Sequence, residues 1–257
     1  MPVVPRSGLV AAWANAWLQG LVSPDDAAAA IAGAGVPHRV AGAPGEDGPV
    51  SWPVALGRLR AAGATGFRVC LPAPGDVSGL PGPASFNEAA LAAGEAVLVA
   101  GATAEGGLGL VPQRETGSGT TWFVLPTSRR LAPPAVSSLA EADRALAEGL
   151  REATAALAAL DVARGREQLS GQLRSLEQAL DRLRMPPGTS SRALQVLHRA
   201  LRLRVLVEYA AADDGAAMTA GQAAARAAAL QPLDGLARHA AAAAFHAAVE
   251  PVPQRRR

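Results

Sequence analysis

The apolar positions in the second half of the chain recur every three or four residues, the spacing of an amphipathic helix. One leucine-rich stripe covers residues 146–160 and another covers residues 169–183. The stripe slips by two residues between them, where Gly165 lies, so we expect a kink or break there. Pro186-Pro187-Gly188 ends this long arm, because proline cannot continue a helix. A return helix follows, so residues 138–209 are predicted to form an antiparallel helical hairpin.

The return helix has apolar residues on two nearly opposite faces. One face holds Leu194, Leu197, Leu201 and Val205, and the other holds Val196, Leu203 and Val207. A helix that is apolar on two sides is normally buried on two sides. We therefore place it at the centre of the C-terminal half, with Leu201 facing the long arm. Either the last helices or a second copy of the chain would cover the other side.

Helix starts are marked by local signals along the whole chain. Residues 9–21 have helical spacing, with Trp13 and Trp17 on the core face. A serine precedes a proline in the first turn of two further helices, and Ser-x-x-Glu capping boxes open two more. These four starts are Ser23-Pro24, Ser51-Trp52-Pro53, Ser85 to Glu88 and Ser138 to Glu141. Pro232 is expected to separate two final helices, the last over residues 233–249.

Strands are predicted in the first half, where short β-branched or apolar runs lie between turns. The predicted strands cover residues 67–71, 96–100, 108–112 and 121–125, and the Pro- and Gly-rich segments 37–49 and 72–83 are read as loops. These strands form a small antiparallel sheet backed by the early helices, which is an α+β architecture. The predicted organisation is an α+β domain at 1–134, a helical bundle at 135–250 and a disordered tail at 251–257.

Composition narrows the class of protein only slightly. Hydrophobic residues make up 49% of the 257, and the formal net charge is only +2. Every basic residue other than histidine is an arginine, which fits the codon bias of a GC-rich genome. The small net charge is far below that expected of a dedicated nucleic-acid-binding protein with a basic stripe. Cys70 is the single cysteine and is read as a small buried hydrophobe. With no apolar run long enough to span a membrane, we expect a cytoplasmic protein.

The sequence contains no motif that specifies a reaction. The Gly-rich segment 101–109 lacks the Lys-Ser/Thr of a phosphate loop and is read as a hairpin turn. His239 and His246 share a helix face without a neighbouring acid, so they are read as polar-face residues rather than metal ligands. We therefore expect no metal or cofactor, and the sequence does not decide whether the chain is an enzyme.

Two small sets of residues are candidates for binding. Asp76 and Asn87 flank the 72–83 loop, which follows the first predicted strand and is placed to form a pocket wall. The alternative for Asp76 is an Asx turn. Arg192, Arg199 and Arg202 line one side of the return helix and are placed to touch phosphates. The alternative is an arginine stripe whose stems cover apolar surface.

Several segments of the sequence resemble those of an uncharacterised protein family of high-GC Gram-positive bacteria. They are Leu71 to Val77, Gly79 to Pro83, Glu88 to Val97 and Leu157 to Arg164. The resemblance spans most of the chain and implies a cytoplasmic bacterial protein of two halves. It assigns no activity and no site residues.

Three functions remain open on the sequence. The preferred hypothesis is a non-enzymatic interaction or scaffolding protein that binds a protein partner, or itself, through the C-terminal helices. The first alternative is a small-molecule-binding protein or enzyme with a pocket at the 72–83 loop. The second is association with nucleic acid through the arginine side of the return helix.

Overall fold

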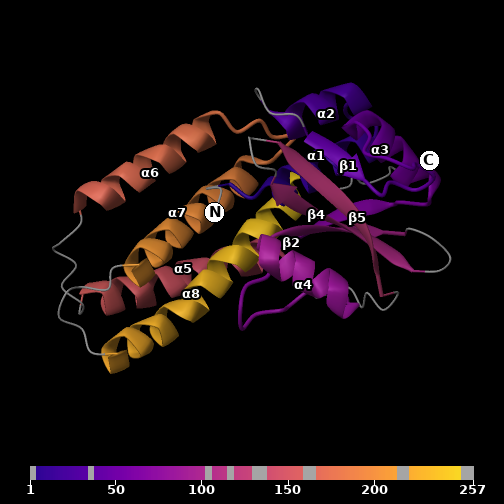
Figure 1. Cartoon of the computed structure of the whole chain (residues 1–257). Coiled ribbons are helices and arrows are strands. Elements are labelled where there is room, and N and C mark those ends of the chain that lie inside the picture. Colours follow the sequence, from indigo (N-terminus) through magenta and orange to yellow (C-terminus); the bar gives the residue numbers. More distant parts are fainter. Residues whose placement is uncertain are drawn as a thin grey trace. The chain divides into compact units, whose positions relative to one another are not determined.

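The structure is a computed structural model that describes residues 4–33, 38–101, 106–114, 119–128, 138–158, 166–212 and 220–249 (Figure 1). The described residues form two compact units. The α+β unit contains those between 5 and 128, together with the short segments 184–189 and 245–249. The helical unit contains Val4 and those between 138 and 183 and between 190 and 244. The predicted domain boundary at 134 and the predicted tail lie outside the described residues.

The α+β unit alternates helices with the strands of one sheet. Its elements are α1 (Arg6–Leu18), α2 (Pro24–Ala32), β1 (His38–Ala41), α3 (Trp52–Ala61), β2 (Gly66–Cys70), α4 (Ala84–Ala93), β3 (Ala96–Ala100), β4 (Gly107–Arg114), β5 (Thr120–Thr127) and the short 3-10 helix η1 (Ala247–Val249). The α+β class is confirmed. Trp13 and Trp17 are buried as predicted, but α1 ends at Leu18 and Leu21 is exposed.

Two of the predicted helix starts in this unit are confirmed and one is wrong. The Ser23 hydroxyl accepts a hydrogen bond from the Asp26 N–H at 3.0 Å, and α3 begins directly after Ser51. The predicted capping box from Ser85 does not form, because α4 already begins at Ala84 with Pro83 as its N-cap. Proline supplies a helix-compatible φ at this position without any side-chain cap.

The sheet has five strands in the order β1-β5-β4-β3-β2. Strands β2 to β5 pair antiparallel, as predicted, and β1 pairs parallel with β5. The sheet is therefore mixed, and the prediction of a loop across residues 38–41 is wrong. This strand has only four residues beside Pro37. Its partner on β5 lies about eighty residues later, so no local pattern reveals it.

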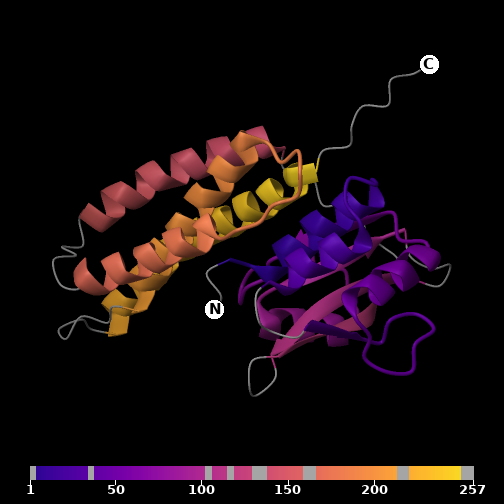
Figure 2. The ribbon, with the colours of Figure 1, turned by 90° about the horizontal axis from the view of Figure 1, so that it is seen from above.

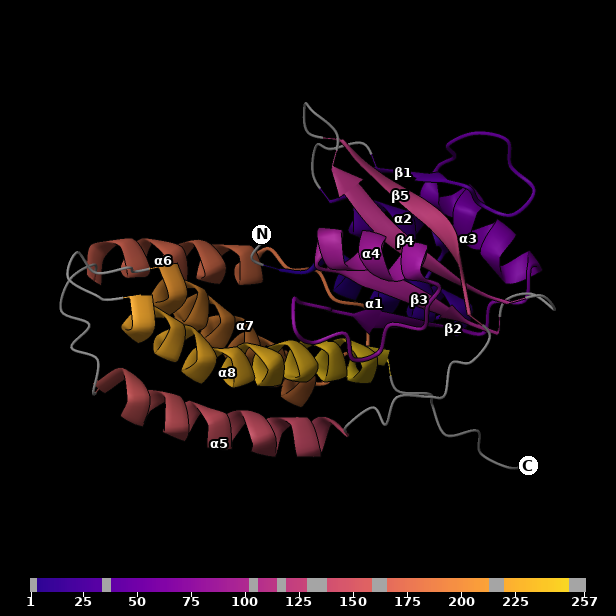
Figure 3. The same cartoon turned by 60° about the horizontal axis from the view of Figure 1, so that its bottom comes forward.

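Helix α4 covers one face of the sheet through a small apolar cluster. Phe86 and Ala90 of α4 pack with Cys70, Leu98 and Val111 from three strands. Cys70 is buried, as predicted. The Phe86 ring lies over Gly109 of β4, where a Cβ would come within 2.4 Å of it. Helices α1 and α3 contact β2, β3 and β1, and Figure 3 shows α4 on the opposite side of the sheet, in front of β4.

Side chains from two helices form hydrogen bonds with backbone groups at the free edge of β2. The Asn15 amide donates to the Phe67 carbonyl and accepts from the Phe67 N–H, both at 2.8 Å. His246 Nε2 accepts from the Val69 N–H at 2.9 Å. An unpaired strand edge is a template for unwanted pairing, and these contacts close it. The prediction that His246 is a polar-face residue is wrong, whereas His239 is exposed as predicted.

The helical unit contains α5 (Leu139–Ala158), α6 (Arg166–Asp181), α7 (Ser191–Ala212) and α8 (Ala220–His246), whose last two residues belong to the α+β unit. Ser138 and Glu141 form the predicted capping box, with hydrogen bonds of 2.8 and 3.2 Å. The predicted break at Gly165 lies outside the described residues. The prediction that Pro232 separates two helices is wrong, because α8 runs through it. Pro232 is exposed, and the hydrogen bond that its missing N–H cannot donate does not end the helix.

Helix α7 packs against both α5 and α6 (Figure 2). Residues of both predicted apolar faces are buried to 1% exposure or less: Val196, Leu197, Leu201 and Leu203. Helix α8 approaches α5 closely at Gly149, where a Cβ would lie 2.7 Å from Leu236. Arg204 of α7 pairs with Asp234 of α8 at 3.6 Å. One chain therefore covers both faces of α7, and no second copy is required to bury them.

Candidate functional site

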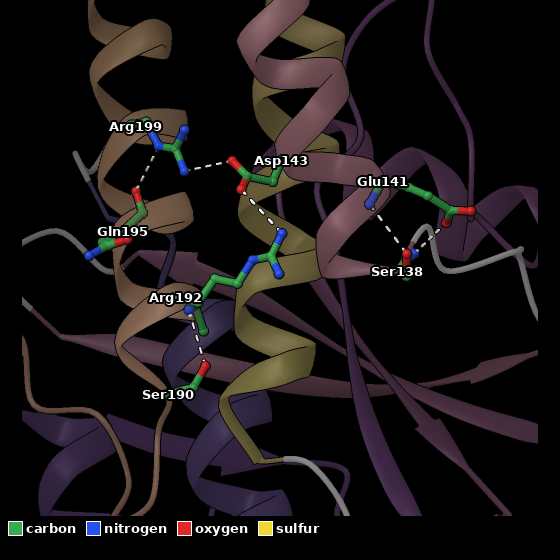
Figure 4. Close-up of polar contacts among 8 residues, drawn as sticks. Ser138, Glu141, Asp143, Ser190, Arg192, Gln195 and Arg199 are labelled. Atoms are coloured by element: carbon green, nitrogen blue, oxygen red, sulfur yellow. Dashed lines mark hydrogen bonds and ion pairs between the residues drawn. The ribbon is translucent and has the colours of Figure 1, made fainter.

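The candidate site in the helical unit is built around Asp143 of α5. Its two carboxylate oxygens pair with two arginines of α7, Arg192 at 3.6 Å and Arg199 at 2.6 Å (Figure 4). The Arg199 Nε also donates to the Gln195 carbonyl at 3.5 Å. The capping box at Ser138 fixes where α5 begins and hence the position of Asp143 along the axis of that helix. Ser190, which accepts from the Ala193 N–H at 3.2 Å, does the same for α7.

The three predicted arginines are not equivalent. Arg192 and Arg199 lie seven residues apart, so they project from the same side of α7 toward one acid. Arg202 is exposed and makes no ion pair with any residue that the structure describes. The Asp143 side chain is 20% exposed, and the two arginine side chains are 58% and 42% exposed. With one acid among three arginines, this side of α7 carries excess positive charge.

Asp76 and Asn87, the predicted pocket residues, each make a local hydrogen bond. The Asp76 carboxylate accepts from the Ser78 N–H at 3.1 Å, which is an Asx turn. The Asn87 Oδ1 accepts from the Gly82 N–H at 2.9 Å, and the Gly82 carbonyl accepts from the Ser128 N–H at 2.9 Å. Both side chains therefore help to fix the 72–83 loop. A ligand pocket there stays a prediction.

A second polar cluster, which no sequence pattern predicted, lies at the start of α1. The N-cap of α1 is Pro5, which has no side-chain acceptor. The Glu95 carboxylate accepts from the Ser7 N–H at 2.8 Å and so supplies the missing cap. Glu95 is only 5% exposed. Burial raises the pKa of Glu95, while the hydrogen bonds from Ser7 and the charges of Arg114 and Arg6 oppose that rise.

His38 of β1 lies in the same region between two donors. Its Nε2 contacts the Arg6 guanidinium, and its Nδ1 lies 3.4 Å from the Trp122 Nε1. Arginine and tryptophan only donate, and a neutral imidazole accepts at one nitrogen. Burial and the positive charge of Arg6 lower the pKa of His38 from 6.5 to about 4, so the ring is neutral at pH 7. The one sequence signal here was Glu95 itself, an acid directly before the apolar run of β3.

The part of the chain that the structure describes contains no group of three or more His, Cys, Asp or Glu side chains placed to hold a metal ion. Nor does any helix in these described ranges have the length and apolarity needed to cross a membrane.

Two family models match consecutive parts of the chain. The Rv1486c-like protein, N-terminal domain, matches residues 7–138, and the Rv1486c-like protein, C-terminal domain, matches residues 140–242. Similar proteins in Mycobacterium tuberculosis are the uncharacterized protein Rv1486c of strain ATCC 25618 / H37Rv and the uncharacterized protein MT1533 of strain CDC 1551 / Oshkosh. Each is 33% identical over 241 residues, covering 77% of this chain and 80% of the relative.

No solved structure matches the chain at a significant level. The relatives confirm the resemblance to an uncharacterised family of high-GC bacteria, and their names assign no activity. Because the two family models together span most of the sequence, the chain belongs to the Rv1486c-like family.

Proposed function

We propose that this chain is a non-enzymatic interaction protein of the cytoplasm that binds an acidic protein partner through the arginine side of α7. The observation that carries the proposal is the arrangement of Arg192, Arg199 and Arg202 beside a single acid, Asp143. Arg202 has unused N–H donors toward solvent, and more than two-fifths of the Arg192 and Arg199 side chains is exposed.

The contact is expected to be polar rather than apolar. The centre of each apolar face of α7 is buried within the chain, and only Leu194 and Val205 at the edges of one face are half-buried. The large apolar side chains that are exposed among the described residues, Leu21, Val54, Val77 and Phe123, all lie in the α+β unit. Complementary charge sets the rate and the specificity of association, so an excess of arginine favours a partner with exposed carboxylates. Each guanidinium offers a planar fork that binds a carboxylate through two hydrogen bonds.

A protein partner suits this surface better than a phosphate backbone. Asp143 lies between Arg192 and Arg199 and repels a phosphate at the point where two of the three arginines converge. A folded partner can avoid Asp143 by placing its carboxylates beside Arg202 and the outer edges of the other two guanidinium groups. Whether the partner is a different protein or another copy of this chain is decided by the experiment.

The test is affinity capture from a lysate of the native bacterium, with nuclease added and with the full chain as bait. The parent chain is compared with the triple variant Arg192→Gln, Arg199→Gln, Arg202→Gln. The matched control is Arg144→Gln, Arg151→Gln, Arg174→Gln, which removes three exposed arginines elsewhere on the helical unit. All three baits are first shown to have similar melting temperatures.

The proposal predicts one protein that the parent and the control retain, that the triple variant loses, and that raised salt releases. A single band whose mass equals that of the bait identifies self-association. If the triple variant retains the same proteins as the parent, the α7 surface is not the binding site. If material is retained only in a parallel capture without nuclease, the ligand is nucleic acid and not a protein partner.

A further inference from the structure

In Figure 3 the ribbon of α4 lies in front of β4, and no described helix lies in front of β1 and β5 on that side of the sheet. The strand registers place side chains on this face in two rows. Arg39, Thr121 and Gln113 form one row, and Ala41, Phe123 and Val111 form the next. Val111 packs against the α4 cluster. The residues beyond it, toward β1, lie on the same face because side chains alternate along each strand.

Thr121, between Arg39 and Gln113, is buried, but three side chains around it are exposed. Phe123 is 37% exposed. Arg39 and Gln113 are exposed, and neither forms a hydrogen bond or ion pair with any residue in the described ranges. Diagonal neighbours on adjacent strands are about 7–8 Å apart, which long side chains bridge. An aromatic ring, a guanidinium and an amide are therefore available to one ligand.

The charge of the sheet has one sign. None of the five described strands contains Asp or Glu, and their charged side chains are Arg39, Arg68 and Arg114. Glu95, directly before β3, is buried against the start of α1 and so does not neutralise the exposed Arg39. The exposed face thus suits an anionic ligand that also offers a flat ring.

We propose that the area formed by Arg39, Gln113 and Phe123, here named the open sheet face, binds single-stranded nucleic acid. One unpaired base stacks on the Phe123 ring, the Arg39 guanidinium binds the adjoining phosphate, and the Gln113 amide hydrogen-bonds to the edge of a base. A protein partner is disfavoured, because a single exposed apolar side chain offers little area for a buried interface core. The open sheet face is independent of the α7 arginines and of the function proposed for them.

This geometry sets the expected salt dependence. With one or two phosphates neutralised, log K falls with log[salt] by a slope of about −0.7 per phosphate for a single strand. Binding should therefore be weak and only mildly sensitive to salt. A duplex should bind more weakly than a single strand, because its bases are already stacked on each other.

The test is fluorescence anisotropy of a labelled oligothymidylate of about 12 nucleotides, long enough to span a typical single-strand site. The full-length parent is compared with Phe123→Leu and Arg39→Gln, after each variant is shown to melt like the parent. Loss of one base stack is expected to weaken binding about fivefold to a hundredfold in Phe123→Leu. Arg39→Gln should also bind more weakly and show a shallower salt slope.

Two controls separate this surface from the other arginines. Arg174→Gln, an exposed position on α6, and the triple α7 variant should both bind the oligonucleotide as the parent does. Absence of binding by the parent at low salt would overturn the proposal. So would equal affinity for a duplex of the same length, or loss of binding in the α7 variant with none in Phe123→Leu.

Discussion

At the scale of single residues, Leu201 and Arg202 are neighbours with opposite surroundings. Leu201 is 1% exposed among the helices, whereas Arg202 is exposed. Truncating a buried leucine removes transfer free energy and leaves a cavity, which costs about 2–5 kcal/mol. A surface substitution usually changes stability by about 0.5 kcal/mol or less. We predict a clear fall in melting temperature for Leu201→Ala and little change for Arg202→Ala. A larger fall for Arg202→Ala would mean that the arginine is buried.

Two histidines make the α+β unit sensitive to acid. Burial, with the charge of Arg68, lowers the pKa of His246 from 6.5 to about 4, and burial with Arg6 has the same effect on His38. The unfolded chain takes up these two protons near pH 6.5, so it binds more protons than the native state between pH 6.5 and 4. The free energy of unfolding therefore falls as the pH drops through this window.

His246→Gln isolates one of the two contributions. The glutamine amide oxygen can still accept from the Val69 N–H but takes up no proton in this range. Burial raises the pKa of Glu95, so this group has the opposite effect on the pH dependence of stability. Glu95 is present in both proteins, so the difference between the parent and variant profiles isolates the contribution of His246. We expect thermal unfolding from pH 7 to pH 4 to show a shallower loss of stability for the variant. Parallel profiles for parent and variant would contradict the role of His246.

At the scale of elements, local signals were predictable and long-range contacts were not. The caps at Ser23 and Ser138 join residues three apart, so the sequence shows them directly. The contacts that hold α1 to the sheet join Ser7 to Glu95 and Asn15 to Phe67, 88 and 52 residues apart. His246 reaches Val69 across 177 residues. No period or spacing encodes such pairs.

In the candidate site, too, the features set by a single helix could be predicted and the contacts between helices could not. The helical spacing of Arg192 and Arg199 placed them on one side of α7 correctly, since that depends only on the helix itself. Their shared acid, Asp143, lies on another helix and was not identified as their partner. The strand β1 was missed because four residues beside a proline carry little pattern, and its pairing depends on β5.

Glycines in two elements provide a matched pair of tests. A Cβ on Gly109 of β4 would lie 2.4 Å from the Phe86 ring and 3.1 Å from Thr127. Phe86 is fully buried, so it has little room to move. Gly57 of α3 is exposed, and a Cβ there would meet nothing within 4 Å. We predict that Gly109→Ala destabilises by about 1–3 kcal/mol and Gly57→Ala stabilises by about 0.5–1 kcal/mol.

Chemical denaturation of both glycine variants measures these changes in the free energy of unfolding. Stabilisation by Gly109→Ala would show that α4 does not pack on β4 as described. Destabilisation by Gly57→Ala would show that the outer side of α3 is covered.

At the scale of the whole molecule, the central claim is that α7 is enclosed by its own chain, so only its arginine side is available to a partner. Native-state hydrogen exchange of the dilute parent protein tests this directly. Within the helical unit, the backbone amides of buried α7 residues such as Val196 and Leu201 should exchange slowest. The amides of α6 should exchange faster, because more of the surface of α6 is exposed. The protection of α7 should not change with protein concentration. Exchange of α7 as fast as that of α6, or protection that rises with concentration, would mean that a second molecule covers α7.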